Sequence, residues 1–271
     1  MAFGMNGLGK RPVSSYIKED LWCARGSERI HSVLFAPRAM NGYAPVVVCA
    51  HAFGGSYRDT VDYAESMARN GYVAVSIDLR GGSSHSTSDG DVMNASVATM
   101  AQDIESVVRA LVMRSDVDVD NIYLMGQGEG AVAATRVATS GAADIRGMVL
   151  CYPTFNLQDL MVKAFGTASK IPESFDLWQV AGRAFGLDAI SNDPYAGMES
   201  YEGRTIIFHG DRDKIAPFAY SHKAARLLPN ARIEVLSKVA HGFFGIAART
   251  VVEESLNMIE ATRVRKASAA A

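Results

Sequence analysis

The stretch "NIYLMGQGEGAVAAT", Asn121–Thr135, decides the fold class of this 271-residue chain. An apolar run, Ile122–Met125, meets three glycines at alternating positions, and a helical pattern of small residues follows them. A strand that passes through glycines into a helix is typical of α/β proteins, whose ligands bind beyond the carboxyl ends of the strands. The stretch therefore predicts a functional turn, with Gly128 at its centre.

Apolar runs alternate with helical patterns on both sides of this turn, which predicts a parallel sheet with helices on both faces. The first two strands, joined by Gly26-Ser27-Glu28, are expected to form an antiparallel hairpin at one edge. The predicted strands span residues 16–25, 29–36, 44–51, 72–80, 122–125, 147–153, 204–210 and 231–237. The predicted helices span residues 59–70, 95–114, 130–139, 219–228 and 245–264.

The segment Phe155–Tyr201 interrupts the alternation and is rich in aromatic residues, with a mostly helical period. A connection of this length is usually a lid or a cap. We therefore expect one domain over residues 1–271 with a cap inserted at 155–201. Phe175, Trp178 and Phe185 are candidates to line a substrate pocket over the glycine turn, or to form the core of the cap itself.

Composition excludes several functions. The net charge of −2 does not suggest a nucleic-acid or anionic-membrane partner. The three cysteines, Cys23, Cys49 and Cys151, are widely spaced, which argues against a disulfide framework and a zinc cluster and fits a reducing compartment. The sequence has no signal-peptide pattern and no apolar stretch of about 18 residues. We expect a cytoplasmic protein, with the oligomeric state open and a homodimer as one option.

One interpretation of the glycine turn is a dinucleotide site, because Gly126-x-Gly128-x-x-Ala131 fits the pattern G-x-G-x-x-G/A between a strand and a helix. That site also needs an acidic residue at the end of the following strand, to hold a ribose. The following strand ends in Cys151-Tyr152-Pro153, and Asp144 lies before that strand, at its wrong end. The dinucleotide site is therefore the weaker alternative.

The other interpretation is a nucleophile elbow, a crowded turn that lifts one side chain above the sheet. Gly126 and Gly130 supply the small residues that such a turn needs, and only the nucleophile is missing. An acid-bearing loop, Asp211-Arg212-Asp213, follows one later strand, and His241 follows the next. The chain order elbow, acid, histidine is that of hydrolase triads. Of the other histidines, His209 is expected to pack at a strand end, and His31 and His222 to lie on the surface.

With these segments together, the sequence resembles the α/β-hydrolase superfamily over nearly its whole length. Within it, the chain looks most like the small bacterial feruloyl (cinnamoyl) esterases. The resemblance rests on "HAFGG", "DLRGGSSHSTSDG", "NIYLMGQGEGA", "DPYAGMESYEGRTIIFHGDRDKIAP" and "VAHGFFG". It implies an α/β-hydrolase fold, in which a mostly parallel eight-stranded sheet is flanked by helices and carries an inserted helical cap.

The resemblance also implies the residues of a catalytic site. The backbone N–H groups of Phe53 and Glu129 would form an oxyanion hole. Asp213, from H-G-x-x-D, would be the acid in preference to Asp211, and His241 would be the base. The substrate would be a small ester, with no cofactor and no metal.

Two departures from the family pattern bear on function. Ala52 stands where the oxyanion turn commonly reads H-G, and Gly128 stands at the nucleophile position. Glycine has no side chain to form an acyl-enzyme, so covalent ester hydrolysis is lost or was removed by engineering. His241 could still activate a water for weak hydrolysis, or the chain could be a non-catalytic binding protein. If only the nucleophile is lost, Gly128→Ser should create esterase activity at a cost in stability.

Overall fold

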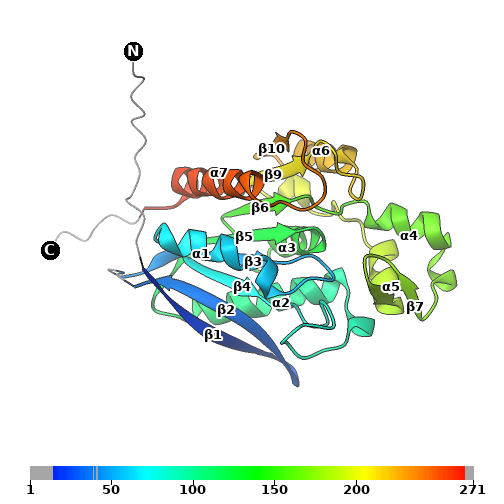
Figure 1. Ribbon diagram of the computed structural model, residues 1–271, viewed down its shortest axis with the longest axis horizontal. Coiled ribbons are helices and arrows are strands. Elements are labelled where there is room, and N and C mark those ends of the chain that lie inside the picture. Colours follow the sequence, from blue (N-terminus) through cyan, green and yellow to red (C-terminus); the bar gives the residue numbers. More distant parts are fainter. Residues whose placement is uncertain (1–14, 39, 41, 266–271) are drawn as a thin grey trace, which may run out of the picture.

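The computed structural model describes residues 15–38, 40 and 42–265, and a single large sheet forms its centre (Figure 1). The sheet has eight strands in the order β1-β2-β4-β3-β5-β6-β9-β10. β1 is antiparallel to β2, and β2 is antiparallel to β4, while all other neighbours are parallel. The predicted mostly parallel, eight-stranded sheet with an edge hairpin is therefore confirmed. Its strands are β1 Tyr16–Arg25, β2 Glu28–Pro37, β3 Ala44–Ala50, β4 Val73–Ile77, β5 Val117–Gln127, β6 Gly147–Cys151, β9 Arg204–Gly210 and β10 Ala231–Leu236.

Helices cover both faces of the sheet. α1 and α7 contribute to one apolar layer, and α2, α3 and α6 contribute to the other. Both layers are needed because every residue of β3 and β4 is buried, as expected for strands that read as continuous apolar runs. None of the described helices is long and apolar enough to cross a membrane. The helices are α1 Val61–Arg69, α2 Val97–Val112, α3 Glu129–Ser140, α4 Leu157–Phe165, α5 Arg183–Ser191, α6 Phe218–Leu227 and α7 Ile246–Thr262, with short 3-10 turns at Tyr57–Asp59, Val92–Asn94, Ala168–Lys170 and Met198–Ser200.

The register of the central strands brings two glycine turns together. In the parallel pairing of β3 with β5, Ala50 lies opposite Gly126. The residues that follow β3, from His51 onward, therefore run beside the residues that lead from β5 into α3. This juxtaposition builds the site described below.

The segment between β6 and β9 contains α4, α5 and a small two-stranded antiparallel sheet, β7 Ser174–Asp176 with β8 Val180–Gly182. Figure 1 shows these elements grouped together beyond one end of the large sheet. The expectation of a mostly helical insertion is therefore wrong for this hairpin. The hairpin rests tightly on the turn before α2, because a Cβ on Gly182 would overlap the backbone carbonyl of Met93. Residues 155–201 are called the insertion below.

Candidate functional site

The turn from β5 into α3 has the backbone of a nucleophile elbow. Gly128 has φ 51° and ψ −118°, in a region that glycine adopts without the penalty that a Cβ brings. Its two neighbouring glycines are fixed by contact: a Cβ on Gly126 would overlap the backbone of Ala131, and one on Gly130 would overlap the backbone carbonyl of His51. The crowding that the sequence pattern predicted is therefore present on both sides of position 128.

Position 128 itself faces the residue that follows β3. A Cβ built on Gly128 would lie 2.9 Å from the Cβ of Ala52, closer than two such carbons approach in proteins, and apart from the chain neighbours of Gly128 no other side chain lies within 4 Å of it. Ala52 and Gly128 are the two departures from the family pattern, and they lie next to each other in the structure. The methyl group of Ala52 takes up the space that a nucleophile's Cβ would need.

The two backbone N–H groups expected to form an oxyanion hole both face the side chain of Glu129. The N–H of Phe53 donates to Oε2 of Glu129 at 3.0 Å, and Glu129's own N–H also interacts with its carboxylate. Oε1 accepts a hydrogen bond from Nε1 of Trp178, in the insertion, at 2.8 Å. Both N–H groups that were expected to bind an oxyanion thus face a carboxylate of the chain itself.

Glu129 is only 1% exposed, and this burial raises the pKa of its carboxyl. The hydrogen bonds from its own N–H, Phe53 and Trp178 stabilise the charged form and work in the opposite direction, but burial is the larger effect. Glu129 is thus a buried acid beside the elbow, which the sequence pattern does not reveal, because only its backbone N–H was expected to matter.

Asp213 and His241 form a hydrogen-bonded pair beside the cavity. Oδ2 of Asp213 lies 2.8 Å from Nδ1 of His241, and Oδ1 accepts hydrogen bonds at 2.9 Å from the N–H groups of Ile215 and Ala216. Burial works to raise the pKa of Asp213, but the hydrogen bond from His241 and the backbone N–H groups outweigh it, so the pKa is lowered. A charged Asp213 accepts a hydrogen bond from the Nδ1–H of His241 and leaves Nε2 of His241 free to act as a base.

Asp211, the alternative acid, is exposed and accepts a hydrogen bond from the N–H of Lys238 at 2.6 Å. The contact with His241 is thus made by Asp213, as expected, while the catalytic role of the pair stays a prediction. His209 is fully buried between Ser221 and the carbonyl of Ala216, as expected.

The expectation of a surface position is wrong for His31 and holds for His222, which is exposed. The His31 ring is buried between the rings of Trp22 and Tyr57, and its Nε2 lies 2.9 Å from Asp20. His31 pairs with Trp22 across the edge hairpin, and this cross-strand stacking covers it.

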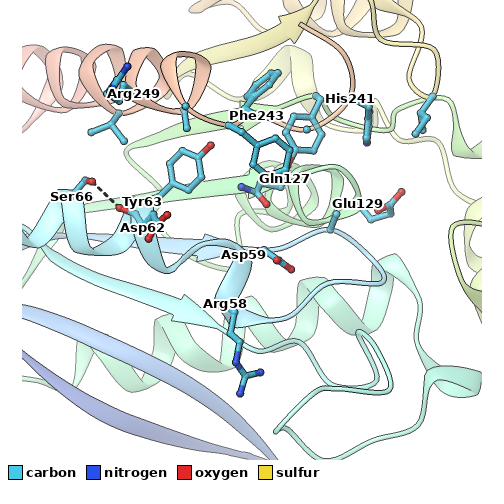
Figure 2. A pocket seen from close by; sticks show the side chains of 18 of the residues that line it. Arg58, Asp59, Asp62, Tyr63, Ser66, Gln127, Glu129, His241, Phe243 and Arg249 are labelled. Atoms are coloured by element: carbon cyan, nitrogen blue, oxygen red, sulfur yellow. Dashed lines mark hydrogen bonds between the residues drawn. The ribbon is translucent and has the colours of Figure 1, made fainter.

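A cavity of about 710 Å³ adjoins the elbow (Figure 2). It runs from His241 and Glu129 to a space between α1 and α7. Its lining is mixed, with apolar and charged side chains, and consists of Ala52, Phe53, Arg58, Asp59, Asp62, Tyr63, Ser66, Gln127, Glu129, Tyr152, Trp178, Ile215, residues 241–245, Ala248, Arg249, Val252 and Glu253. A cavity of this size and composition is typical of a site for a small organic molecule.

Of the three aromatic residues expected to line the pocket, Trp178 does so and the other two do not. Phe185 is fully buried, with its ring 4.6 Å from that of Phe53, and Phe175 packs edge-on against Phe165 at 5.2 Å. The expectation that these two line the pocket is therefore wrong. The Phe175 ring packs within the insertion and the Phe185 ring packs against the main domain, so both hold the insertion in place, and Trp178 lines the cavity.

Sequence reasoning missed Tyr152, which directly follows β6. Its φ of 39° is unusual for a residue with a side chain, and its ring packs edge-on against His241 and Phe243, at 4.6 and 4.7 Å. Such strained residues cluster at functional sites. Its position at the carboxyl end of a strand indicated a place near the site, but that position was considered only for an acidic residue.

Comparisons with known proteins identify the family and the fold of the chain. A family model described as serine aminopeptidase, S33 (Hydrolase_4) matches residues 43–196, more than half of the chain. A non-heme haloperoxidase from Rhodococcus erythropolis is 35% identical over 77 residues, and the match covers only 28% of either protein's length.

Among solved structures, Est1E from Butyrivibrio proteoclasticus with bound ferulic acid superimposes with a TM-score of 0.79 at 19% identity, over 89% of this chain and 99% of that one. An esterase, EaEST, from Exiguobacterium antarcticum superimposes with a TM-score of 0.66 at 16% identity, over 88% of this chain and 98% of that one. At these identities the structural likeness shows the α/β-hydrolase fold. Together with the family match, it shows that the chain belongs to the S33 serine aminopeptidase family of α/β hydrolases.

Proposed function

We propose that this chain binds a small molecule of the carboxylic-ester class in the cavity beside Gly128, and does not hydrolyse it through an acyl-enzyme. One observation carries the proposal: the carboxylate of Glu129 accepts a hydrogen bond from the N–H of Phe53, an expected oxyanion donor, beside Gly128, which has no side chain. Covalent ester hydrolysis needs both an attacking group and free N–H donors for the oxyanion. Here Gly128 supplies no attacking group, and the N–H of Phe53 already donates to Glu129.

The cavity and the family support the ligand class. Trp178 and Phe243 offer aromatic surface, and the hydrogen bond from Trp178 fixes the polar side chain of Glu129 beside it. Est1E, which has the same fold, binds ferulic acid, so hydroxycinnamate esters are the first class to test. In this proposal the insertion acts as a cap, with Trp178 as its contact with the ligand, and no cofactor or metal takes part.

A second candidate function is slow hydrolysis by water, and the Asp213–His241 pair favours it. Nε2 of His241 would take a proton from a water at the site of the missing nucleophile, and the resulting hydroxide would attack the ester carbonyl. Enzymes that have lost a triad member keep about 10³–10⁴-fold acceleration over water. Any such activity would therefore be weak, and it would disappear in His241→Gln.

Two measurements test the proposal. Isothermal titration calorimetry with methyl 4-hydroxycinnamate should show binding, and Ala248→Trp, which places a large ring in the cavity wall on α7, should abolish it. Intact-mass analysis after acid quenching of a reaction with 4-nitrophenyl acetate should show no acyl adduct. Undiminished binding in Ala248→Trp would refute the location of the site. An adduct that forms in the unmodified chain would refute the loss of covalent catalysis.

A further inference from the structure

The cavity extends well past His241, and its inner end lies between α1 and α7. Tyr63 from α1, Gln127 from the end of β5 and Tyr152 line this end, with Phe243 and Val252 beside them. Figure 2 shows Tyr63 and Gln127 near each other, on the opposite side of the cavity from Glu129. Nothing in the hydrolase chemistry described above uses these polar groups.

The hydroxyl of Tyr63 has no hydrogen-bond partner among the described residues, although the side chain is only 4% exposed. The Gln127 side chain lies close enough to influence it, but not in hydrogen-bond geometry. Buried hydroxyl groups are nearly always paired, because an unmade hydrogen bond is unfavourable. The hydroxyl oxygen is itself buried, and Tyr63 lines the cavity, so a molecule that reaches this oxygen from the cavity supplies the missing partner.

The inner end is a place for an uncharged group. Burial raises the pKa of Tyr63 and of Tyr152, so both phenols are neutral at physiological pH. Asp59, Asp62 and Glu253 also line the cavity, and their charges disfavour an anion. Of the cations in the cavity lining, Arg58, just before α1, points away from Tyr63 in Figure 2, and Arg249 on α7 is exposed.

We infer that the inner end of the cavity is a binding subsite for an uncharged hydroxyl group of the ligand, with the Tyr63 hydroxyl as its hydrogen-bond partner. This inference rests on the proposed function, because it describes the far end of the same ligand. Gln127 and Tyr152 complete the polar wall, and Phe243 and Val252 pack against the apolar part of the molecule. The subsite selects for a hydroxyl at the end remote from the ester group.

A pair of uncharged ketones tests the subsite without interference from hydrolysis. The probes are 4-(4-hydroxyphenyl)-2-butanone and 4-phenyl-2-butanone, which differ by one hydroxyl, with dissociation constants from calorimetry. The chain should bind the hydroxylated ketone about five- to tenfold more tightly, the factor that one added hydrogen bond of ordinary strength gives. In Tyr63→Phe this ratio should fall to about one, with little change for the ketone that lacks the hydroxyl.

Tyr72→Phe is the matched control. Tyr72 is also a buried tyrosine, but its hydroxyl donates to Glu260 at 2.6 Å and it does not line the cavity, so the ratio should persist. A ratio that is unchanged in Tyr63→Phe, or that is about one in the unmodified chain, overturns the subsite while leaving the proposed function intact. If neither ketone binds, and methyl 4-hydroxycinnamate does not bind either, the proposed function fails with it.

Discussion

Gly128→Ser and Ala52→Gly should be coupled in their effects on the free energy of unfolding. A serine at position 128 must hold φ near +51°, and such sparsely populated conformations cost about 1–3 kcal/mol. Its Cβ would also lie 2.9 Å from the Cβ of Ala52, and overpacking of this kind typically costs about 1–3 kcal/mol more. The single change should therefore destabilise the chain by about 2–6 kcal/mol.

Ala52→Gly removes the methyl group and with it the second of these costs. By itself it should destabilise the chain by about 0.4–1 kcal/mol, because glycine has more conformational freedom in the unfolded state. In the double variant the overpacking is absent, so we expect the two changes to be non-additive by about 1–3 kcal/mol, in the stabilising direction. Urea denaturation of the four proteins gives this coupling energy directly.

Gly141→Ser provides a control for the backbone term. Gly141 ends α3 with φ +70°, and a Cβ there would meet nothing within 4 Å. Its effect should simply add to that of Ala52→Gly. A coupling within about 0.5 kcal/mol of zero between positions 52 and 128 would refute the steric argument.

Activity gives a second test of the same geometry. Even with Ala52→Gly, a serine at position 128 would face an oxyanion hole filled by Glu129, so aryl-ester hydrolysis should stay weak. Adding Glu129→Met, which removes the carboxylate, should raise the rate by about 10²–10³-fold, the usual value of an oxyanion-hole donor. Equal rates in the double and triple variants would mean that Glu129 already leaves the hole when an ester binds.

Three further expectations concern stability. Tyr63→Phe should leave the free energy of unfolding unchanged or raise it by up to about 1 kcal/mol, because it removes an unpaired buried hydroxyl. Tyr72→Phe removes a hydroxyl that is hydrogen-bonded to Glu260, so it should lower the free energy of unfolding by about 0.5–1.5 kcal/mol. Thermal denaturation compares the two variants. The pKa of Asp213 is lowered from 3.8, so the contribution of Asp213 to the free energy of unfolding is complete above about pH 4. This contribution is lost as the pH falls through the lower pKa of the folded state, so the difference in stability between Asp213→Asn and the unmodified chain should shrink in acid. The pKa of Glu129 is raised from 4.5, so the contribution of Glu129 to the free energy of unfolding is complete below that pH and is lost as the pH rises. Above about pH 4.5, urea denaturation should therefore show the stability of Glu129→Gln increasing relative to that of the unmodified chain.

Hydrophobic pattern predicted the central strands well and the short elements poorly. β3 and β4 lie between two layers of helices, so their sequences are continuous apolar runs that are hard to misinterpret. β5 begins at Val117, five residues before the predicted start, because its first residues alternate with aspartates and do not form an apolar run. The hairpin of β7 and β8 has three residues in each strand, too few for a period of two to stand out from a helical pattern.

In the site, spacing along the chain predicted the positions of the backbone but could not predict the directions of the side chains. H-G-x-x-D selected Asp213 over Asp211 because Asp213 lies three positions past the strand end, and the structure puts Asp213 against His241. The carboxylate of Glu129 could not be placed in the same way, since its direction depends on Phe53 and on Trp178 from a distant segment. Tyr63 was hidden because a tyrosine on the inner face of a helix is usually an ordinary core residue.

Three residues at the elbow, Gly128, Ala52 and Glu129, all depart from what an acyl-enzyme mechanism needs. A serine exchanged for glycine in an otherwise active hydrolase would leave neighbours that still accommodate a serine and an empty oxyanion hole. Here Ala52 occupies the space of the missing Cβ, and Glu129 occupies the hole with hydrogen bonds from Phe53 and Trp178. In the function that we propose, these three contacts oppose an acyl-enzyme, so the site as a whole, and not only Gly128, works without one. The coupling energy between positions 52 and 128 measures the first of these contacts directly.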